Sequence, residues 1–523
     1  MRHSIILFIL LCITLSSCRK DFDFEPSTGG LEFSKDTVYL DTVFTNIGSS
    51  TYTLKVYNKS NKDISIPSIK LGKGLDSKYR ITVDGMVGNQ NKLFTNVEVL
   101  AKDSLYIFIE TTVDVAEANP TDFLYTDQIE FYNINSSEPQ TVELVTLIQD
   151  AYFLYPQRFS DGSTEFLQIG DDEVYGFFLD ENDPINGNEL EWNNSKPYVI
   201  YGYAAVPSNQ TLNVQAGARI HFHAQSGLIA ANNASIKVNG LPPTDLENPE
   251  ENLVIFEGDR LEPLYTDVAG QWGRIWLTNG SKNHEFSNCI IKNADFGLLV
   301  EGNTGLGNAD ADVQLKNVQI YNMKFSCIYG VTAYIKGENV VLNNAGLYSL
   351  GCIYGGKYHF NHSTFNNNWP SARQVAVALN NYIEDANPVV QPMEEATFTN
   401  CIIHGTNQLS MVIDKADGAA FNYKFDHCLI RFNNINNIFT NDPLYQFATD
   451  TTHYINCLIA TNPSLFPPDF QNPNNNQFVI GQDSGAIGQG DFNYSTGTFD
   501  LLNKPRTAPS DLGAYNFVEF VED

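Results

Sequence analysis

Basic residues are scarce in this sequence. Of its 523 residues, 31 are Lys or Arg and 61 are Asp or Glu, which gives a formal net charge of −30 at pH 7. A chain with this charge repels the phosphates of DNA and RNA and the headgroups of anionic lipids. The sequence contains no basic patch that would offset the repulsion. We therefore expect no nucleic acid among its partners.

Long amphipathic helical stretches and Cys-x-x-Cys pairs are also missing. Without such a pair there is no redox or zinc-ribbon signature. The chain has instead 37 Gly, 22 Pro and 12% aromatic residues, together with abundant Asn. This composition is typical of turn-rich, all-β proteins. Because 523 residues exceed one ordinary core, we expect two domains or an elongated repeat.

Short segments of the chain nearly repeat one another. Each has a large first residue in most copies, Asn or His at the third position, and mostly apolar residues at the fourth and sixth. The strong copies begin at Phe286, Phe398, Phe425 and Tyr454, and the weaker copies at Leu315, Gly337 and Phe360. Their spacing indicates a coil of roughly 25 residues per turn, as in stacked β-solenoids. An ordinary β-sandwich with accidental similarity is the alternative.

The third residue of each copy is predicted to form a backbone corner. Residues four and six lie on one face of a strand because side chains alternate along it, whereas the large first residue has the opposite parity. All three can face one core only if the chain bends between them. Asn and His are enriched in the left-handed backbone region that allows this bend. We expect the corner side chains to form a ladder; they are Asn288, Asn317, Asn339, His362, Asn400, His427 and Asn456.

A second set of repeats supports the period. Cys327-Ile-Tyr-Gly330 and Cys352-Ile-Tyr-Gly355 lie 25 residues apart, and Gly297-Leu-Leu-Val300 occupies the equivalent place one turn earlier. We expect these three segments to pair as neighbouring strands. All six Cys outside the N-terminal segment lie in the repeats at core positions, which predicts buried free thiols. A disulfide between stacked neighbours such as Cys401 and Cys428 is the alternative.

The N-terminus carries the longest apolar run, from Ile5 to Leu15. The run is too short to span a bilayer and is typical of the core of a secretory signal peptide. It leads into Leu15-Ser-Ser-Cys18, which resembles the lipobox of bacterial lipoproteins. The resemblance implies that residues 1–17 are removed and that Cys18 is lipidated on its sulfur and its new amino group, which anchors the chain without a transmembrane helix. A cleaved signal with a chance Cys is the alternative.

The residues after Cys18 bear on location. They read Arg19-Lys-Asp-Phe-Asp23, which resembles the Lys-then-acidic signal that directs lipoproteins of the Bacteroidota to the outer face of the outer membrane. The localisation that this resemblance implies is the cell outer membrane, with the chain lipid-anchored and facing outside.

The remainder of the chain divides by pattern. Residues 18–30 are a polar tether, and residues 31–150 alternate as in the strands of an immunoglobulin-like β-sandwich. Residues 151–210 form a transition and an N-terminal cap. Residues 211–480 hold the coil, which we interpret as a parallel β-helix, and residues 481–523 form a C-terminal cap that covers its open end.

The C-terminal cap contains Ser484-Gly-Ala-Ile487 and Asp511-Leu-Gly-Ala-Tyr515. These segments resemble the ending of many right-handed parallel β-helix proteins, in which Ser-Pro-Ala-Ile precedes Asp-Ile-Gly-Ala-Tyr; Gly485 and Leu512 depart from that pattern. Together with the lipobox, this makes the whole chain similar to Bacteroidota surface lipoproteins that carry a pectin-lyase-like domain. The fold class implied is all-β, with an N-terminal immunoglobulin-like β-sandwich followed by a right-handed parallel β-helix solenoid.

Enzymes of that fold family group carboxylates and a basic residue on adjacent turns. The outward positions of the repeats show no such stack, so we assign no catalytic residue and no metal ligand. Asp310 with Asp312, and His221 with His223, come nearest to a metal site. We interpret the first pair as a polar turn and the second as structural histidines. No cofactor is expected, with Ca²⁺ as the alternative.

Trp272, Arg274 and Trp276 are the remaining candidates for ligand binding. The rings of Trp272 and Trp276 could stack on a sugar, and packing in a core or cap is the competing interpretation. Our leading hypothesis is a non-enzymatic surface lipoprotein that serves in adhesion, glycan binding or as an envelope scaffold. Its expected partners are the membrane, through the lipid, and a polysaccharide or an envelope protein. The alternatives are a polysaccharide lyase or glycoside hydrolase acting in the groove of the β-helix, and a structural spacer.

Overall fold

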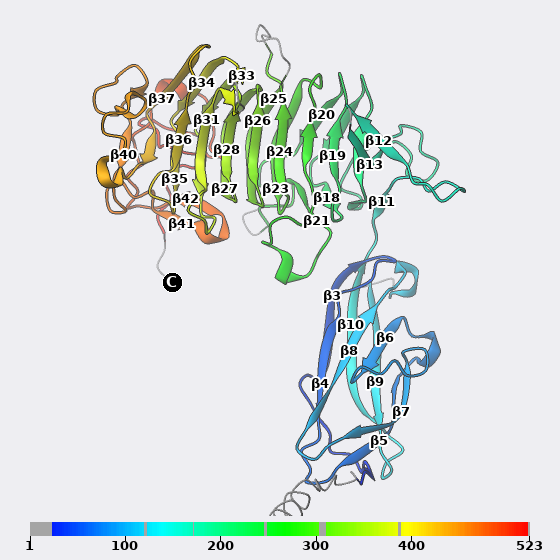
Figure 1. Cartoon of the computed structure of the whole chain (residues 1–523). Coiled ribbons are helices and arrows are strands. Elements are labelled where there is room, and N and C mark those ends of the chain that lie inside the picture. The colour runs from blue at the N-terminus through cyan, green and yellow to red at the C-terminus, as the bar shows by residue number, and fades with distance from the viewer. Residues whose placement is uncertain are drawn as a thin grey trace, which may run out of the picture. The chain divides into compact units, whose positions relative to one another are not determined.

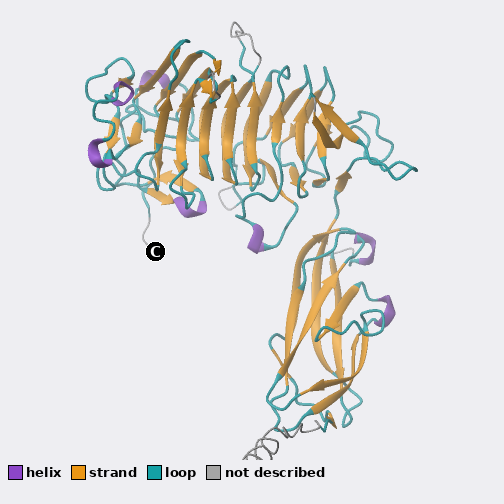
Figure 2. Cartoon of the chain, viewed as in Figure 1, coloured by secondary structure: helices purple, strands orange, loops and turns teal. Residues whose placement is uncertain are grey.

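The structure is a computed structural model (Figure 1). It describes residues 23–119, 123–170, 172–244, 248–302, 310–384 and 389–520. Cys18 and the signal segment lie outside the described residues. Strands dominate, and the helices of the described chain are short 3-10 turns (Figure 2), which confirms the all-β prediction. These turns are η1 (Gly74–Asp76), η2 (Val115–Glu117), η3 (Pro263–Tyr265), η4 (Ile435–Asn437), η5 (Pro443–Tyr445), η6 (Pro473–Asn475) and η7 (Phe492–Tyr494).

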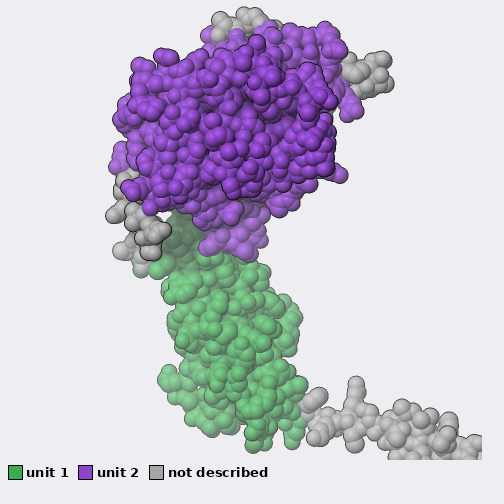
Figure 3. All heavy atoms as spheres, turned by 90° about the vertical axis from the view of Figure 1, so that its left-hand side faces the viewer, with its two compact units in different colours: residues 1–150 green, residues 151–523 purple. Residues whose placement is uncertain are grey.

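The chain divides into two compact units, residues 1–150 and residues 151–523, which Figure 3 colours separately. The strands of unit 1 are β1 (Glu25–Pro26), β2 (Glu32–Phe33), β3 (Thr37–Phe44), β4 (Tyr52–Tyr57), β5 (Ile64–Leu71), β6 (Tyr79–Val83), β7 (Leu93–Val99), β8 (Ser104–Thr111), β9 (Leu124–Tyr132) and β10 (Gln140–Gln149). They form one sheet in the order β1-β5-β9-β10-β3, with β7 also paired to β5, and a second in the order β2-β4-β8-β6.

The two sheets of unit 1 share one apolar core. Alternation along each strand turns every second side chain inward, as at Leu54 and Val56 of β4 and Ile107 and Ile109 of β8. Most neighbouring strands are antiparallel, whereas β1 with β5 and β10 with β3 are parallel.

Unit 2 consists mainly of two long sheets. The first contains β11 (Tyr152–Leu154), β14 (Glu191–Trp192), β15 (Tyr198–Ile200), β17 (Thr211–Gln215), β18 (Arg219–Phe222), β20 (Ser235–Asn239), β21 (Val254–Gly258), β23 (His284–Lys292), β25 (Val313–Met323), β27 (Tyr334–Ala345), β29 (Gly356–Asn361), β30 (Thr364–Asn367), β34 (Met393–Thr399), β35 (Ile402–Gly405), β37 (Phe421–Asp426), β38 (Leu429–Arg431), β39 (Tyr454–Ile455) and β40 (Leu458–Ala460). We call it the corner sheet, because its longer strands bend at the predicted corners.

The second long sheet, which we call the face sheet, contains β12 (Phe166–Ile169), β13 (Asp172–Phe178), β16 (Tyr203–Val206), β19 (Gly227–Ala230), β22 (Ile275–Leu277), β24 (Phe296–Glu301), β26 (Ser326–Val331), β28 (Tyr348–Ile353), β31 (Val375–Asn380) and β36 (Met411–Asp414). Two small antiparallel ribbons are β32 (Tyr382–Ile383) with β33 (Val389–Val390) and β41 (Phe470–Asn472) with β42 (Gln477–Ile480). In the two long sheets the strands pair in parallel, except for the antiparallel pair β12–β13.

The two long sheets enclose one continuous apolar core that runs from Leu154 to Tyr454. The stacked strands begin at β11 and β15, before residue 211, at which the sequence pattern placed the start of the coil. No helix among the described residues combines the length and the apolar character that crossing a bilayer requires.

The register of the corner sheet follows the sequence repeats. Cys289 pairs with Val318, and Val318 pairs with Val340. Farther along, Ile402 pairs with Leu429, and Leu429 pairs with Leu458. The residues that precede them therefore lie in one row; they are Cys401, Cys428 and Cys457. The described Cys are all free, and each is buried except the partly buried Cys457. The prediction of unpaired thiols in the core is therefore confirmed.

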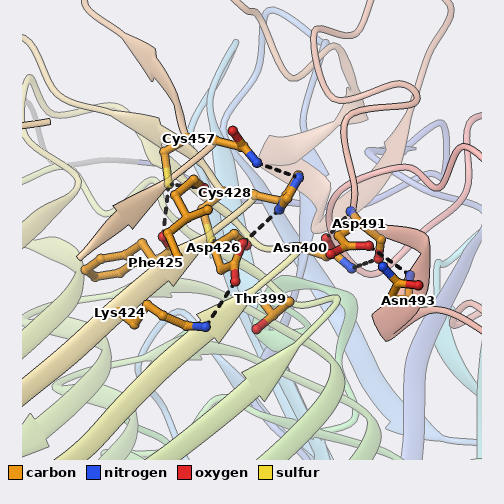
Figure 4. A network of polar contacts seen from close by, with 12 residues as sticks. Thr399, Asn400, Lys424, Phe425, Asp426, Cys428, Cys457, Asp491 and Asn493 are labelled. Atoms are coloured by element: carbon orange, nitrogen blue, oxygen red, sulfur yellow. Dashed lines mark hydrogen bonds and ion pairs between the residues drawn. The ribbon is translucent and has the colours of Figure 1, made fainter. Parts of the chain in front are cut away.

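The corner prediction is also confirmed. All seven corner residues have positive φ, from 46° at His362 to 55° at Asn317. Their side chains form a ladder, because Nδ2 of Asn339 donates to Oδ1 of Asn317, and Nδ2 of Asn317 donates to Oδ1 of Asn288, both at 2.9 Å. At Asn400 the ladder meets the C-terminal segment: Nδ2 of Asn400 donates to the carbonyl of Asp491 at 3.1 Å (Figure 4).

The predicted register of the face sheet is wrong by three residues in one place. Leu298 pairs with Ile328 as expected, but Cys352 pairs with Gly330 and not with Cys327. The two Cys-Ile-Tyr-Gly segments therefore occupy different positions on their strands. Tyr354 has a φ of 57° and lies beyond the end of β28, where the chain turns. The sequence similarity of these two segments arises without structural equivalence.

Candidate functional site

The structure separates Trp272 from Arg274 and Trp276, the other two residues that the sequence offered as ligand contacts. Trp272 is 1% exposed and belongs to the core. Its ring stacks on Phe222 with a centroid distance of 4.3 Å, and its Nε1 donates to the carbonyl of Lys292 at 2.9 Å. The assignment of Trp272 as a ligand-binding residue is therefore wrong, since no ligand reaches it.

Trp276 lies on the outer surface of the face sheet. Its neighbours in β22, Ile275 and Leu277, are buried in the core, so strand alternation turns Trp276 outward. The pairing of the strands continues this outward row from Trp276 to Leu299 of β24 and Tyr329 of β26. Each of these three side chains is partly exposed.

We call the aromatic face a set of five rings on four neighbouring strands or their ends: Trp276, Phe296, Phe325, Tyr329 and Tyr348. The last four are joined by ring contacts, whereas Trp276 is joined to Phe296 through Arg274. Phe296 stacks on Phe325 at 5.1 Å and meets Tyr329 edge-on at 5.8 Å, between ring centroids. Tyr329 stacks on Tyr348 at 6.5 Å. All five side chains are partly exposed. Rings packed at these distances support one another and leave part of their surface to solvent.

Two cations lie over the aromatic face. The guanidinium carbon of Arg274 is 5.8 Å from the ring centroid of Trp276 and 5.4 Å from that of Phe296. Nζ of Lys324 is 5.1 Å from the ring centroid of Phe325 and 3.5 Å from Oδ1 of Asp295. Contacts of this kind hold the cations against the rings.

Two hydrogen-bond donors of the aromatic face have no partner in the described part of the chain. They are Nε of Arg274 and Nε1 of Trp276, and both atoms are buried. A buried donor without an acceptor costs free energy.

The phenols beside this surface are neutral donors at ordinary pH. Burial raises the pKa of Tyr203, although the positive charge of Arg274 opposes the shift. Burial, and to a smaller extent Tyr348, also raises the pKa of Tyr329. Both hydroxyls therefore keep their protons.

The two histidines considered as metal ligands have separate partners. Nδ1 of His221 lies 3.2 Å from the carbonyl of Gly258, in a buried position. Nδ1 of His223 lies 2.7 Å from Oδ2 of Asp259. These contacts agree with the interpretation of both as structural.

The two aspartates considered as Ca²⁺ ligands, Asp310 and Asp312, differ in their surroundings. Oδ2 of the buried Asp312 accepts a hydrogen bond from the backbone N–H of Tyr334 at 2.7 Å, whereas Asp310 is exposed. In the part of the chain that the structure describes, no group of three or more His, Cys, Asp or Glu is arranged to hold a metal ion.

Four members of the aromatic face were not among the residues predicted from sequence as ligand contacts, namely Phe296, Phe325, Tyr329 and Tyr348. The strand register was the signal that could have found them. Phe296 pairs with Ser326, which follows Phe325, and Ser326 in turn pairs with Tyr348. Rings that recur at the same place on successive passes of the chain stack on one surface.

Comparison with known proteins adds little. The sequence matches no protein-family model and no curated protein. Among solved structures it is similar to a family 123 glycoside hydrolase from Clostridium perfringens, with 11% identity and a TM-score of 0.17, over 25% of this chain and 30% of that chain. It is also similar to the ASH/PapD-like domain 7 of human CEP192, with 15% identity and a TM-score of 0.15, over 26% of this chain and 96% of that domain. The chain thus spans less than a third of the hydrolase, and we draw nothing from either likeness.

Proposed function

We propose that this chain is a non-enzymatic surface lipoprotein that binds glycan on the aromatic face. The observation that carries the proposal is the set of five partly exposed rings across β22, β24, β26 and β28, of which four pack on one another and two lie under Arg274. Neighbouring strands lie about 4.8 Å apart, so an extended sugar chain that runs along the stack meets one ring after another.

We also propose that unit 1 is an immunoglobulin-like sandwich and that unit 2 is a right-handed, pectin-lyase-like β-helix. The parallel stacking of unit 2 supports this description, as do the corner residues with positive φ, because both recur on successive passes of the chain.

The membrane part of the proposal rests on the sequence alone. Cys18 carries the lipid, and the acidic residues after it direct the chain to the outer face of the outer membrane. Protease treatment of intact cells should then release the protein. Substitution of Cys18→Ala should abolish incorporation of a palmitate analogue, and full protection from protease would refute surface display.

The binding test uses the purified full-length protein in detergent and a panel of acidic and neutral polysaccharides. Affinity electrophoresis should show retardation by at least one polysaccharide. The variants Trp276→Ala and Tyr329→Ala should each lower the affinity for that polysaccharide roughly tenfold, the scale expected when stacking of one ring is lost. Tyr494→Ala is the matched control, because it removes an exposed ring away from the aromatic face. Equal retardation of all three variants would contradict the assignment of the site.

The same panel separates binding from catalysis. Each polysaccharide is incubated with the protein and Ca²⁺, and the products are followed by ultraviolet absorbance and by reducing-end assay. Unsaturated or shortened products would overturn the non-enzymatic proposal in favour of a polysaccharide lyase or a glycoside hydrolase. Binding with intact polymer supports it.

A further inference from the structure

A hollow lies on the outer surface of the corner sheet. It is a cleft of about 400 Å³ whose floor consists of outward residues of β23 and β25: Asn288, Ile290, Asn317, Gln319 and Tyr321. One wall is the segment around Pro249 to Leu253, and the other consists of C-terminal residues between Gln471 and Tyr515. The cleft therefore joins three parts of the chain that are distant in sequence.

Arg219 of β18 binds the first wall through two hydrogen bonds. Its Nη1 donates to the carbonyl of Leu253 at 2.6 Å, and its Nη2 donates to the carbonyl of Glu250 at 2.7 Å. Burial lowers the pKa of this guanidinium, although the carboxylate of Glu250 opposes the shift. Charged donors on two backbone carbonyls hold this part of the wall in place.

The second wall is fixed by contacts with the corner sheet. Leu501 and Tyr515 pack with Val341 of β27 in a small apolar cluster. Nδ2 of Asn343, also on β27, donates to Oδ1 of Asn476 at 2.7 Å. Both walls are thus attached to strands, and the cleft is preformed.

The lining of the cleft is rich in amides. The side chains of Asn and Gln supply both donors and acceptors, and they alternate with apolar surface; the amide residues are Asn288, Asn317, Gln319, Gln471, Asn475, Asn476 and Gln477. Among the described lining residues, Glu250 carries the only formal charge. A ligand with negative charge would find no cation there and would face this carboxylate.

Two phenols complete the lining. The hydroxyl of Tyr515 donates to Oε1 of Gln319 at 3.5 Å. Tyr321 packs against Leu253 and Ile290 and lines the cleft. Burial, followed by nearby Glu250 and Asp267, raises the pKa of Tyr321. It therefore remains a neutral donor in an acidic setting.

We propose that this amide-lined cleft binds an uncharged oligosaccharide, one or two sugar residues at a time. Sugar hydroxyls donate and accept like the amides of the lining, and the apolar surface of Ile290 on the floor and Leu253 on the first wall suits the C–H face of a pyranose. The volume accommodates a ligand of about that size, and the single carboxylate disfavours uronates and phosphates. This site goes beyond the aromatic face and does not depend on it, so either site can fail alone.

The test measures binding of cellobiose, maltose, lactose and N,N′-diacetylchitobiose to the full-length protein by saturation-transfer NMR, with digalacturonate as the anionic counterpart. At least one neutral disaccharide should bind and digalacturonate should not. Gln319→Ala and Tyr321→Phe should each weaken binding roughly fivefold, the effect of losing one hydrogen bond. The Tyr321→Phe variant retains the ring and its packing, so it tests the contact even if the Gln319 variant is unstable.

Tyr494→Ala serves as the matched control, because it removes an exposed ring that does not line the cleft, and it should leave disaccharide binding unchanged. The inference is overturned if no neutral disaccharide binds, if digalacturonate binds equally well, or if Tyr321→Phe binds as the parent does. Loss of disaccharide binding in Trp276→Ala but not in Tyr321→Phe would assign the sugar to the aromatic face instead. Polysaccharide retardation that persists while disaccharides fail would contradict the cleft and leave the proposed function standing.

Discussion

Arg506 of the C-terminal segment donates from Nη2 to Oδ1 of Asn339, at 2.9 Å, across 167 residues of sequence. Asn339 is a corner residue of β27, and the same Nη2 also donates to the carbonyl of Gly513 at 3.0 Å. Arg506 is 5% exposed, and burial lowers the pKa of its guanidinium to about 10. The end of the chain is thus attached to the middle of the asparagine ladder by a buried charge.

Arg506→Ala should destabilise the protein by about 2 to 3 kcal/mol, because it leaves two buried acceptors without this donor and opens a cavity. Amide hydrogen exchange over residues 498–515 should speed up in the variant. Lys504→Ala is the control: its side chain is exposed in the same segment, and its effect should stay within about 0.5 kcal/mol. Unchanged exchange in the Arg506 variant would contradict a fastening role.

The backbone and the side chain of Asn317 make separate contributions to the stability of this corner. Its φ is 55°, and its side chain hydrogen bonds to both Asn288 and Asn339. Asn317→Gly keeps the backbone conformation and loses the hydrogen bonds, whereas Asn317→Ala also places a Cβ in the left-handed region. We expect the Ala variant to be less stable than the Gly variant by about 1 kcal/mol, as measured by urea unfolding. Equal stability of the two would argue against backbone strain at this corner.

Sequence reasoning located the corners because a local rule decides them. Each of these corners needs a residue with positive φ, and Asn and His are among the non-Gly residues enriched in that region. The same argument placed Cys289 and Val318 side by side, and the structure pairs them. Periodicity and parity thus specified the register of the corner sheet at the repeat copies, such as those of β23, β25 and β27.

Sequence reasoning failed where side-chain direction depends on other passes of the chain. Trp272 and Trp276 are four residues apart, yet one is in the core and the other on the surface. Cys352 resembles Cys327 in its local sequence, yet lies three residues away in register. Local rules could not predict the amide-lined cleft, since its walls come from residues as far apart as Glu250 and Tyr515, which are separated by 265 positions.

His284 predicts a pH dependence of stability. Its ring is buried, Nδ1 accepts a hydrogen bond from the N–H of Ile236 at 3.1 Å, and burial together with Lys237 lowers its pKa to about 3. The unfolded chain binds this proton near pH 6.5, so the unfolded state holds more protons at acidic pH. The stabilising contribution is therefore complete above pH 6.5 and is lost as pH falls towards 3.

The variant His284→Gln isolates this contribution. Glutamine retains an acceptor for Ile236 and does not titrate. Between pH 7 and pH 5 the free energy of unfolding of the parent should fall by about 2 kcal/mol more than that of the variant, measured from urea midpoints at both pH values. A parallel decline of the two proteins would show that His284 does not titrate in this way.

The repeat thiols should resist alkylation in the folded protein. Burial raises the pKa of Cys289, and a hydrogen bond with Cys428 followed by burial raises that of the partly buried Cys457. Thiolates carry the reactivity, so iodoacetamide at pH 8 should leave the buried five unmodified and reach Cys457 first. Thr496→Cys supplies an exposed thiol as the control. Peptide mapping should find all six modified after unfolding, and a Cys401–Cys428 disulfide in those maps would contradict the free-thiol core.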